Sequence, residues 1–112
     1  MAQAQVFDGQ TDNGNSTVIT LTDDVAAVVT MSASGTFDSG ILKLQANMLT
    51  SGGTWFDVDT TKNLSAAGFS EFTIYNAKRL RVNLASVAGA AADLDVHLTF
   101  PDSAADNTIT AS

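Results

Sequence analysis

Few side chains in this sequence are suited to catalysis, and no motif brings them together. His97 is the single histidine, the residue type that most often moves protons at neutral pH. No serine or cysteine lies near it in the sequence, and the chain contains no Gly-x-Ser-x-Gly turn to expose a nucleophile. The short run Ser51-Gly52-Gly53-Thr54 lacks the lysine of a phosphate-binding loop and leads into a predicted strand. The sequence therefore predicts no enzyme.

Carboxylates occur in pairs at three places along the chain. The pairs are Asp23-Asp24, Asp57-x-Asp59 and Asp93-x-Asp95. Oxygen ligands of this kind bind calcium when several of them converge, whereas single pairs at strand ends and turns are usually solvated. The sequence does not show whether the three pairs converge, and solvated carboxylates at strand ends and turns are the commoner case, so we predict no metal and no cofactor.

Two aromatic and three basic residues are the best candidates for binding. Trp55 and Tyr75 could stack on a sugar ring, or Trp55 could anchor the core or a subunit interface. Lys43, Arg79 and Arg81 take outward positions on two predicted strands. If those strands are neighbours, the three residues form a positive stripe that could dock an acidic partner or pair with this chain's own carboxylates. We therefore take Lys43, Trp55, Arg79 and Arg81 as candidate partner-binding residues.

These candidates sit on segments that alternate between apolar and polar residues, the pattern of half-buried β-strands. Alternation is clearest in residues 41–48, 78–84 and 94–100, and β-branched residues favour strands at 17–21 and 25–33. Shorter strands are predicted at 54–58 and 69–75. Turns rich in Gly, Asn and Asp separate the strands at intervals of roughly eight to twelve residues. We predict an all-β fold, a single antiparallel β-sandwich of about seven to eight strands, either jelly-roll or immunoglobulin-like.

Length and charge restrict the function further. The 112 residues amount to one domain, and the 45% hydrophobic content is enough for a core. A net charge of -7 argues against nucleic-acid binding. No apolar run reaches the roughly 18 residues of a membrane span, and the first residues do not form a secretory signal, so we expect synthesis and retention in a cytoplasm. Without cysteine, the fold must hold by packing or by subunit contacts.

Both ends of the chain are more polar than the middle. Residues 1–16 are predicted to form an N-terminal arm, residues 17–101 the sandwich, and residues 102–112 a C-terminal tail whose only large apolar residue is Ile109. Such polar terminal arms could become ordered on docking to a partner.

Several turn and strand segments resemble those of small virion proteins of tailed bacteriophages, and the capsid decoration, or cement, proteins are the most similar in kind. The segments are Gly35-Thr36-Phe37-Asp38-Ser39-Gly40, Leu42-Lys43-Leu44-Gln45, Gly52-Gly53-Thr54-Trp55-Phe56-Asp57-Val58 and Arg79-Leu80-Arg81-Val82-Asn83-Leu84. The resemblance covers roughly residues 35–100. It departs from the family pattern at Thr50-Ser51, where such sequences usually carry an aspartate before the paired glycines.

The resemblance implies a non-enzymatic β-sandwich that binds the major capsid protein on the capsid surface of the virion, commonly as a homotrimer, after synthesis in the bacterial host. Two alternatives share the same sequence features. One is a neck, tail or fibre component of the same virion. The other is a carbohydrate-binding β-sandwich in which Trp55 or Tyr75 stacks on sugar and the aspartate-rich turns hold calcium.

Overall fold

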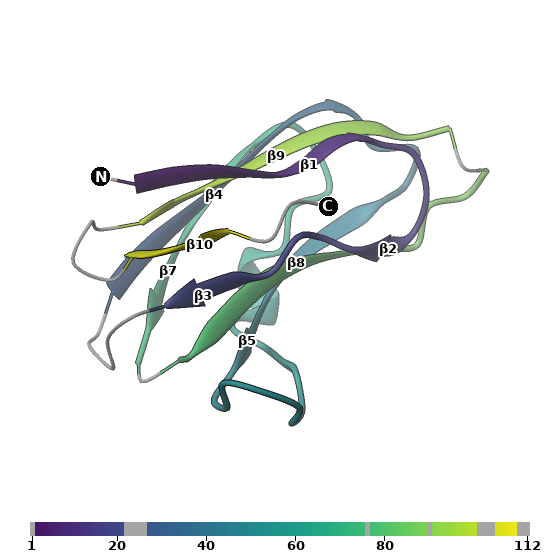
Figure 1. Cartoon of the computed structure of the whole chain (residues 1–112). Helices are drawn as coiled ribbons and strands as arrows, with labels where there is room; N and C mark the ends of the chain where they lie inside the picture. The colour runs from purple at the N-terminus through teal and green to yellow at the C-terminus, as the bar shows by residue number, and fades with distance from the viewer. Residues whose placement is uncertain (1, 22–26, 76, 90, 101–104, 110–112) are drawn as a thin grey trace.

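The computed structural model describes residues 2–21, 27–75, 77–89, 91–100 and 105–109, and their regular secondary structure is almost entirely β-strand (Figure 1). The strands are β1 (Ala2–Gln10), β2 (Gly14–Asn15), β3 (Ile19–Leu21), β4 (Ala27–Thr36), β5 (Ile41–Asn47), β6 (Phe56–Asp57), β7 (Gly68–Ile74), β8 (Arg79–Ala85), β9 (Asp93–Phe100) and β10 (Ala105–Ile109). One short 3₁₀ helix, η1 (Thr60–Lys62), follows β6. The prediction of an all-β fold is confirmed.

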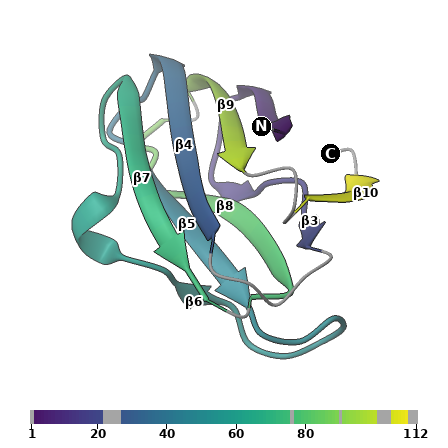
Figure 2. The same ribbon diagram turned by 90° about the vertical axis from the view of Figure 1, so that its left-hand side faces the viewer.

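The strands form two antiparallel sheets that pack against each other (Figure 2). The first sheet has the order β1-β9-β4-β7. The second has the order β10-β3-β8-β5-β6, and β2 also pairs with β8. The sandwich prediction is therefore confirmed. Within the described residues, β7 is one edge of the first sheet and β6 is one edge of the second.

The core comes from the alternation that the sequence shows. In β5, β8 and β9, every second side chain is buried between the sheets and the intervening ones face outward. The buried residues of these three strands are Leu42, Leu44, Ala46, Leu80, Val82, Leu84, Leu94, Val96, Leu98 and Phe100. Phe72 and Ile74 of β7, in the predicted strand 69–75, are also buried. Burial of these side chains provides the main driving force for folding.

The assignment of residues 1–16 to a polar arm is wrong for most of that segment. Residues Ala2–Gln10 pair with β9 along their length as strand β1. Val6 is 0% exposed and Phe7 is 2% exposed. Two register shifts, on either side of Phe7, let these consecutive side chains both enter the core. The sequence analysis missed the strand because polar glutamines alternate with small alanines, and the bulge interrupts the period of two.

The C-terminal prediction also changes. Residues Ala105–Ile109, assigned to a tail, form strand β10 beside β3, with Ile109 opposite Ile19. The remaining parts of the predicted tail, residues 102–104 and 110–112, lie outside the described residues. Backbone pairing at a free sheet edge needs little hydrophobic sequence, so the strand carries a weak sequence signal.

A close approach between β4 and β9 requires glycine at position 35. Gly35 has a φ of 111°, and a Cβ atom there would lie 1.9 Å from the carbonyl oxygen of Asp93.

At the neighbouring turn, the Asp38 carboxylate accepts hydrogen bonds from the amides of Gly89 (3.0 Å) and Ala91 (3.1 Å). These contacts tie the β8–β9 loop to the β4–β5 turn.

Because β1 is part of the core, we predict that Phe7→Ala destabilises the protein by about 3–5 kcal/mol through lost burial and a cavity. Gln5→Ala is the matched control, since this exposed residue lies on the same strand and should change stability by less than about 0.5 kcal/mol. Urea unfolding of both variants measures the difference. If both variants changed the free energy of unfolding by the same small amount, residues 2–10 would not be part of the core.

Asp59 supplies a pH-dependent contact at the start of η1. Its carboxylate accepts hydrogen bonds from the hydroxyl (2.6 Å) and the amide (3.0 Å) of Thr61. These two bonds, in that order, lower the pKa of Asp59 below its ordinary value of 3.8. The stabilisation of the folded state by these two bonds is therefore complete above the pKa that Asp59 has in the unfolded chain. It is lost as the pH falls through the lower pKa that Asp59 has in the folded protein.

We predict that the stability advantage of the wild type over Asp59→Asn is present at pH 6 and shrinks as the pH falls below 3.8. Unfolding curves of both proteins across this range give the difference. Thr61→Val should weaken the pH dependence, because it removes the hydroxyl hydrogen bond, which lowers the pKa of Asp59 more than the amide hydrogen bond does. A difference between wild type and Asp59→Asn that stays constant with pH contradicts the assignment.

Candidate functional site

The strands that carry the predicted basic residues are neighbours. In the antiparallel pairing of β5 with β8, Lys43 lies opposite Asn83, while Arg81 lies opposite Gln45 and Arg79 opposite Asn47. Leucine, valine and alanine occupy the alternate positions and face the core, so the three cations share the outward face. The condition for a positive stripe across the two strands is thus met.

Trp55 lies against both arginines of this face. The guanidinium carbon of Arg81 is 4.3 Å from the centroid of the Trp55 ring, and that of Arg79 is 5.2 Å away. Both distances are within the range of cation–π attraction. Trp55 is only partly buried and does not belong to the core. The structure therefore places three of the four candidate residues in direct contact.

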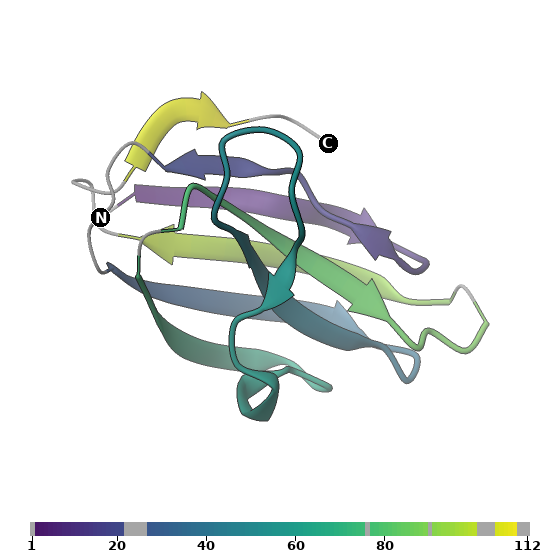
Figure 3. The ribbon, with the colours of Figure 1, turned by 90° about the horizontal axis from the view of Figure 1, so that it is seen from below.

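Arg79 and Asn47 hold the loop that leads from β5 to Trp55. Arg79 donates from Nε to the carbonyl oxygen of Leu49 (2.9 Å) and from Nη2 to that of Gly52. Asn47, which is fully buried, donates to the same Gly52 oxygen (2.9 Å) and accepts from the Leu49 amide (2.9 Å). We call residues 48–55 the braced loop. It projects below β5 in Figure 1, and Figure 3 views the molecule from that side.

Arg81 belongs to a second set of hydrogen bonds on the same face. Its Nε donates to Oε1 of Gln45 (2.8 Å), and Nε2 of Gln45 donates to Oδ1 of Asp57 (2.9 Å). Burial lowers the pKa of the Arg81 guanidinium, and the charge of nearby Arg79 lowers it further. Gln45 therefore links Arg81 to Asp57 without a direct ion pair.

No direct ion pair within the described residues neutralises the three cations of this face, and the nearest carboxylate that they reach by hydrogen bonds is Asp57, through Gln45. None of Lys43, Arg79 and Arg81 makes an ion pair there, and the two arginines bond to neutral oxygens instead. The alternative of pairing with this chain's own carboxylates is thus not found in the described part of the chain. The face, which we call the basic face, can attract an anionic partner.

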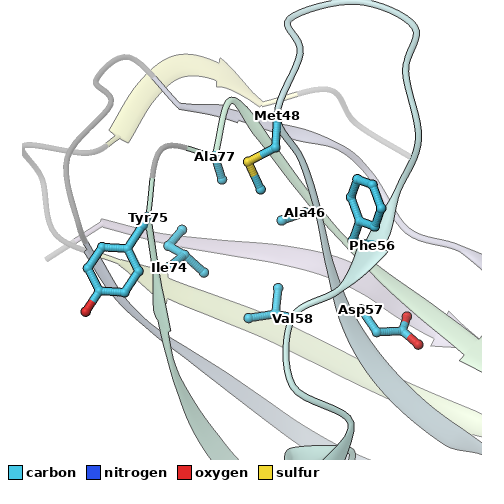
Figure 4. A pocket seen from close by; sticks show the side chains of 8 residues that line it. All are labelled: Ala46, Met48, Phe56, Asp57, Val58, Ile74, Tyr75 and Ala77. Atoms are coloured by element: carbon cyan, nitrogen blue, oxygen red, sulfur yellow. The ribbon is translucent and has the colours of Figure 1, made fainter.

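A small apolar hollow lies on the side of β6 away from the basic face, between the edges of the two sheets (Figure 4). Its volume is about 180 Å³. Phe56 and Tyr75 stand at opposite rims, and they are 55% and 66% exposed. The lining residues are Ala46, Met48, Phe56, Asp57, Val58, Ile74, Tyr75 and Ala77. Asp57 is thus the one charged residue among them.

Sequence reasoning missed this hollow. Residues 54–58 were predicted to be a strand, but only Phe56–Asp57 is one. Met48, the last residue of the predicted strand 41–48, is 44% exposed beyond the end of β5. Both differences arise because β6 is a two-residue edge strand that covers little of β5. The adjacent apolar pair Met48-Leu49 directly before a Thr-Ser-Gly-Gly turn was the available signal, since turn segments are usually polar.

The other candidates do not assemble into a site. His97 faces outward on β9, opposite Gln5 and Ser32, and no hydrogen bond joins its imidazole to another described residue. Across the described ranges, no three His, Cys, Asp or Glu side chains lie close enough to share a metal ion. The pair Asp23-Asp24 lies outside those ranges. In the described part of the chain, no helix has the length and apolarity to cross a membrane.

Comparison with known proteins finds no matching family model and no matching curated protein. The function must therefore be inferred from the basic face, the braced loop and the hollow.

The contact between Trp55 and Arg81 predicts an energetic coupling. In a double-mutant cycle with Trp55→Leu and Arg81→Met, we expect a coupling free energy of about 0.5–2 kcal/mol, because the cation–π contact is partly desolvated. A second cycle with Lys43→Met serves as the control, since Lys43 has no contact with the ring and should couple by less than about 0.5 kcal/mol. Urea unfolding supplies the four free energies of each cycle. Equal coupling in both cycles contradicts the arrangement.

Proposed function

We propose that this chain is a non-enzymatic structural protein of a phage virion, a capsid decoration protein that binds the head shell as a homo-oligomer, with a trimer favoured. The observation that carries this proposal is the basic face. A chain with a net charge of -7 concentrates Lys43, Arg79 and Arg81 on one sheet face and leaves them without carboxylate partners in the described residues. Such a face is suited to an acidic surface of the major capsid protein.

The braced loop beside this face supports docking. Leu49 is 55% exposed, while its amide and its carbonyl oxygen are both held by hydrogen bonds from the sheet. A loop that is already ordered loses little conformational entropy on binding, so more of the contact energy contributes to affinity. Repeated contacts made by an oligomer on a regular shell add through avidity.

The structure changes which part of the chain we assign to shell contact. The sequence suggested that residues 1–16 reach across the shell as an arm. Because Ala2–Gln10 is paired with β9 and partly buried, those residues are committed to the sandwich. The proposal therefore places shell docking on the basic face and the braced loop.

The test is co-sedimentation of the purified full chain with phage shells that lack the protein, with light scattering to measure its solution mass. We expect saturation at a fixed ratio, a trimeric mass, and weaker binding as salt is raised. Lys43→Glu should weaken binding about tenfold, or ~1.4 kcal/mol, because it reverses a charge on the basic face.

Lys62→Glu is the matched control, since it makes the same change in net charge from η1, outside the basic face. A chain that ignores shells, or equal weakening by the two variants, would overturn the proposal. Binding to tails or neck structures instead would favour the alternative location within the virion.

A second candidate function is carbohydrate binding, and the exposed Tyr75 favours it. Its ring lies at the rim of the hollow, and such an aromatic platform suits the apolar face of a sugar ring. Trp55 is less suited to this role, because two guanidinium groups already lie against its ring. A glycan screen with Tyr75→Ala as the control distinguishes this candidate from shell binding.

A further inference from the structure

The apolar hollow lies where both sheets end. Among the described residues, β6 on one side of it pairs only with β5, and β7 on the other side pairs only with β4. Edge strands present backbone groups that can accept an added segment. Lys62 covers part of the β7 edge by donating to the carbonyl oxygen of Glu71 (2.8 Å), but Glu71 does not line the hollow. The edge is therefore covered beside the hollow and left open at it.

The size of the hollow selects the kind of occupant. Sites for drug-sized molecules usually measure about 300–1,000 Å³. At about 180 Å³ this hollow is smaller, and it suits one large side chain. Ala46, Ile74 and Ala77 are buried around it, whereas Phe56 and Tyr75 leave more than half of their surface exposed at its rims. A side chain placed between the rims would remove that apolar surface from water.

The charge of the hollow narrows the choice further. Asp57 is the one charged residue of the lining, and its Oδ1 already accepts a hydrogen bond from Gln45. The carboxylate points outward from β6, away from the centre of the hollow (Figure 4). Because consecutive residues of an extended segment face opposite ways, a cation next in sequence to the apolar side chain that enters the hollow would meet this carboxylate. The exposed large apolar residues of the described chain are Val28, Met48, Leu49, Phe56, Phe69 and Tyr75. None of them stands next to a lysine or arginine in the sequence, so a second copy of the chain does not supply the matching pair.

We propose that this hollow binds an extended segment of a different protein through one large aliphatic or aromatic side chain, with an adjacent lysine or arginine held by Asp57. The segment runs along the open edge between β6 and β7. The site differs from the basic face in the partner it would attract. The basic face would attract an anionic partner, whereas the hollow would bind a segment that carries a cation. The test of this site does not depend on shell binding, although Asp57 and Arg81 of the basic face both bond to the side chain of Gln45.

The site is tested by nuclear magnetic resonance of the isotope-labelled full chain, to which one of three hexapeptides with blocked ends is added. The first is Thr-Thr-Lys-Leu-Thr-Thr, the second replaces its leucine with alanine, and the third replaces its lysine with glutamate. We expect the first to shift the amide signals of Val58, Ile74 and Ala77 saturably. The alanine peptide should give no saturable shift, and the glutamate peptide should bind about fivefold more weakly.

Protein variants separate the two parts of the recognition. Asp57→Asn should reduce the difference in affinity between the lysine peptide and the glutamate peptide. The alanine peptide should still give no saturable shift with this variant. Tyr75→Ser should weaken binding of the first peptide, and Phe69→Ser is the matched control, because it is also 66% exposed but does not line the hollow.

The proposal is overturned if none of the peptides produces saturable shifts, if all three bind alike, or if Phe69→Ser weakens binding as much as Tyr75→Ser. Shifts of the same amides on raising the concentration of the chain alone, without peptide, would identify a second copy as the occupant and overturn the assignment to a different protein.

Discussion

The register between β5 and β8 is the constraint on which the rest of this molecule depends. Since successive side chains of a strand point to opposite faces, a slip by one residue would place Arg79 and Arg81 in the core and Leu80 and Val82 in water. The energetic penalty for that slip is large, so the outward position of the arginines follows from the burial of their neighbours. The hydrophobic core thereby fixes the basic face, although no residue of that face is part of the core.

The arginines serve the fold as well as the surface. Arg79 uses its donors on the carbonyl oxygens of Leu49 and Gly52, and Trp55 covers both guanidinium groups. A side chain held in this way has lost most of its rotamer freedom before any partner arrives. Lys43, which is half-buried, has no such bond among the described residues. Binding contributions on the basic face are therefore unequal, with Lys43 acting by charge and the arginines chiefly by organising the loop.

The sequence predicted those parts of the structure that period-two patterning determines. The buried sets of β5, β8 and β9, and the common face of Lys43, Arg79 and Arg81, follow from alternation together with strand adjacency. It did not predict β1, because the bulge at Phe7 breaks the period. It did not predict the hollow or the packing of Trp55 on the arginines either. These depend on how a two-residue strand and a loop settle against distant residues, which no local pattern encodes.

The short strand β6 connects the two surfaces. Trp55 lies on the outward arginines, and the next residue, Phe56, lies at the rim of the hollow, because consecutive residues of extended chain face opposite ways. Asp57 then joins Gln45 on the outer face while its side chain also lines the hollow. A displacement of this segment would therefore alter both surfaces together. Since Gln45 also bonds to Arg81, a cation that draws the Asp57 carboxylate toward the hollow competes with the hydrogen bond that orders the basic face.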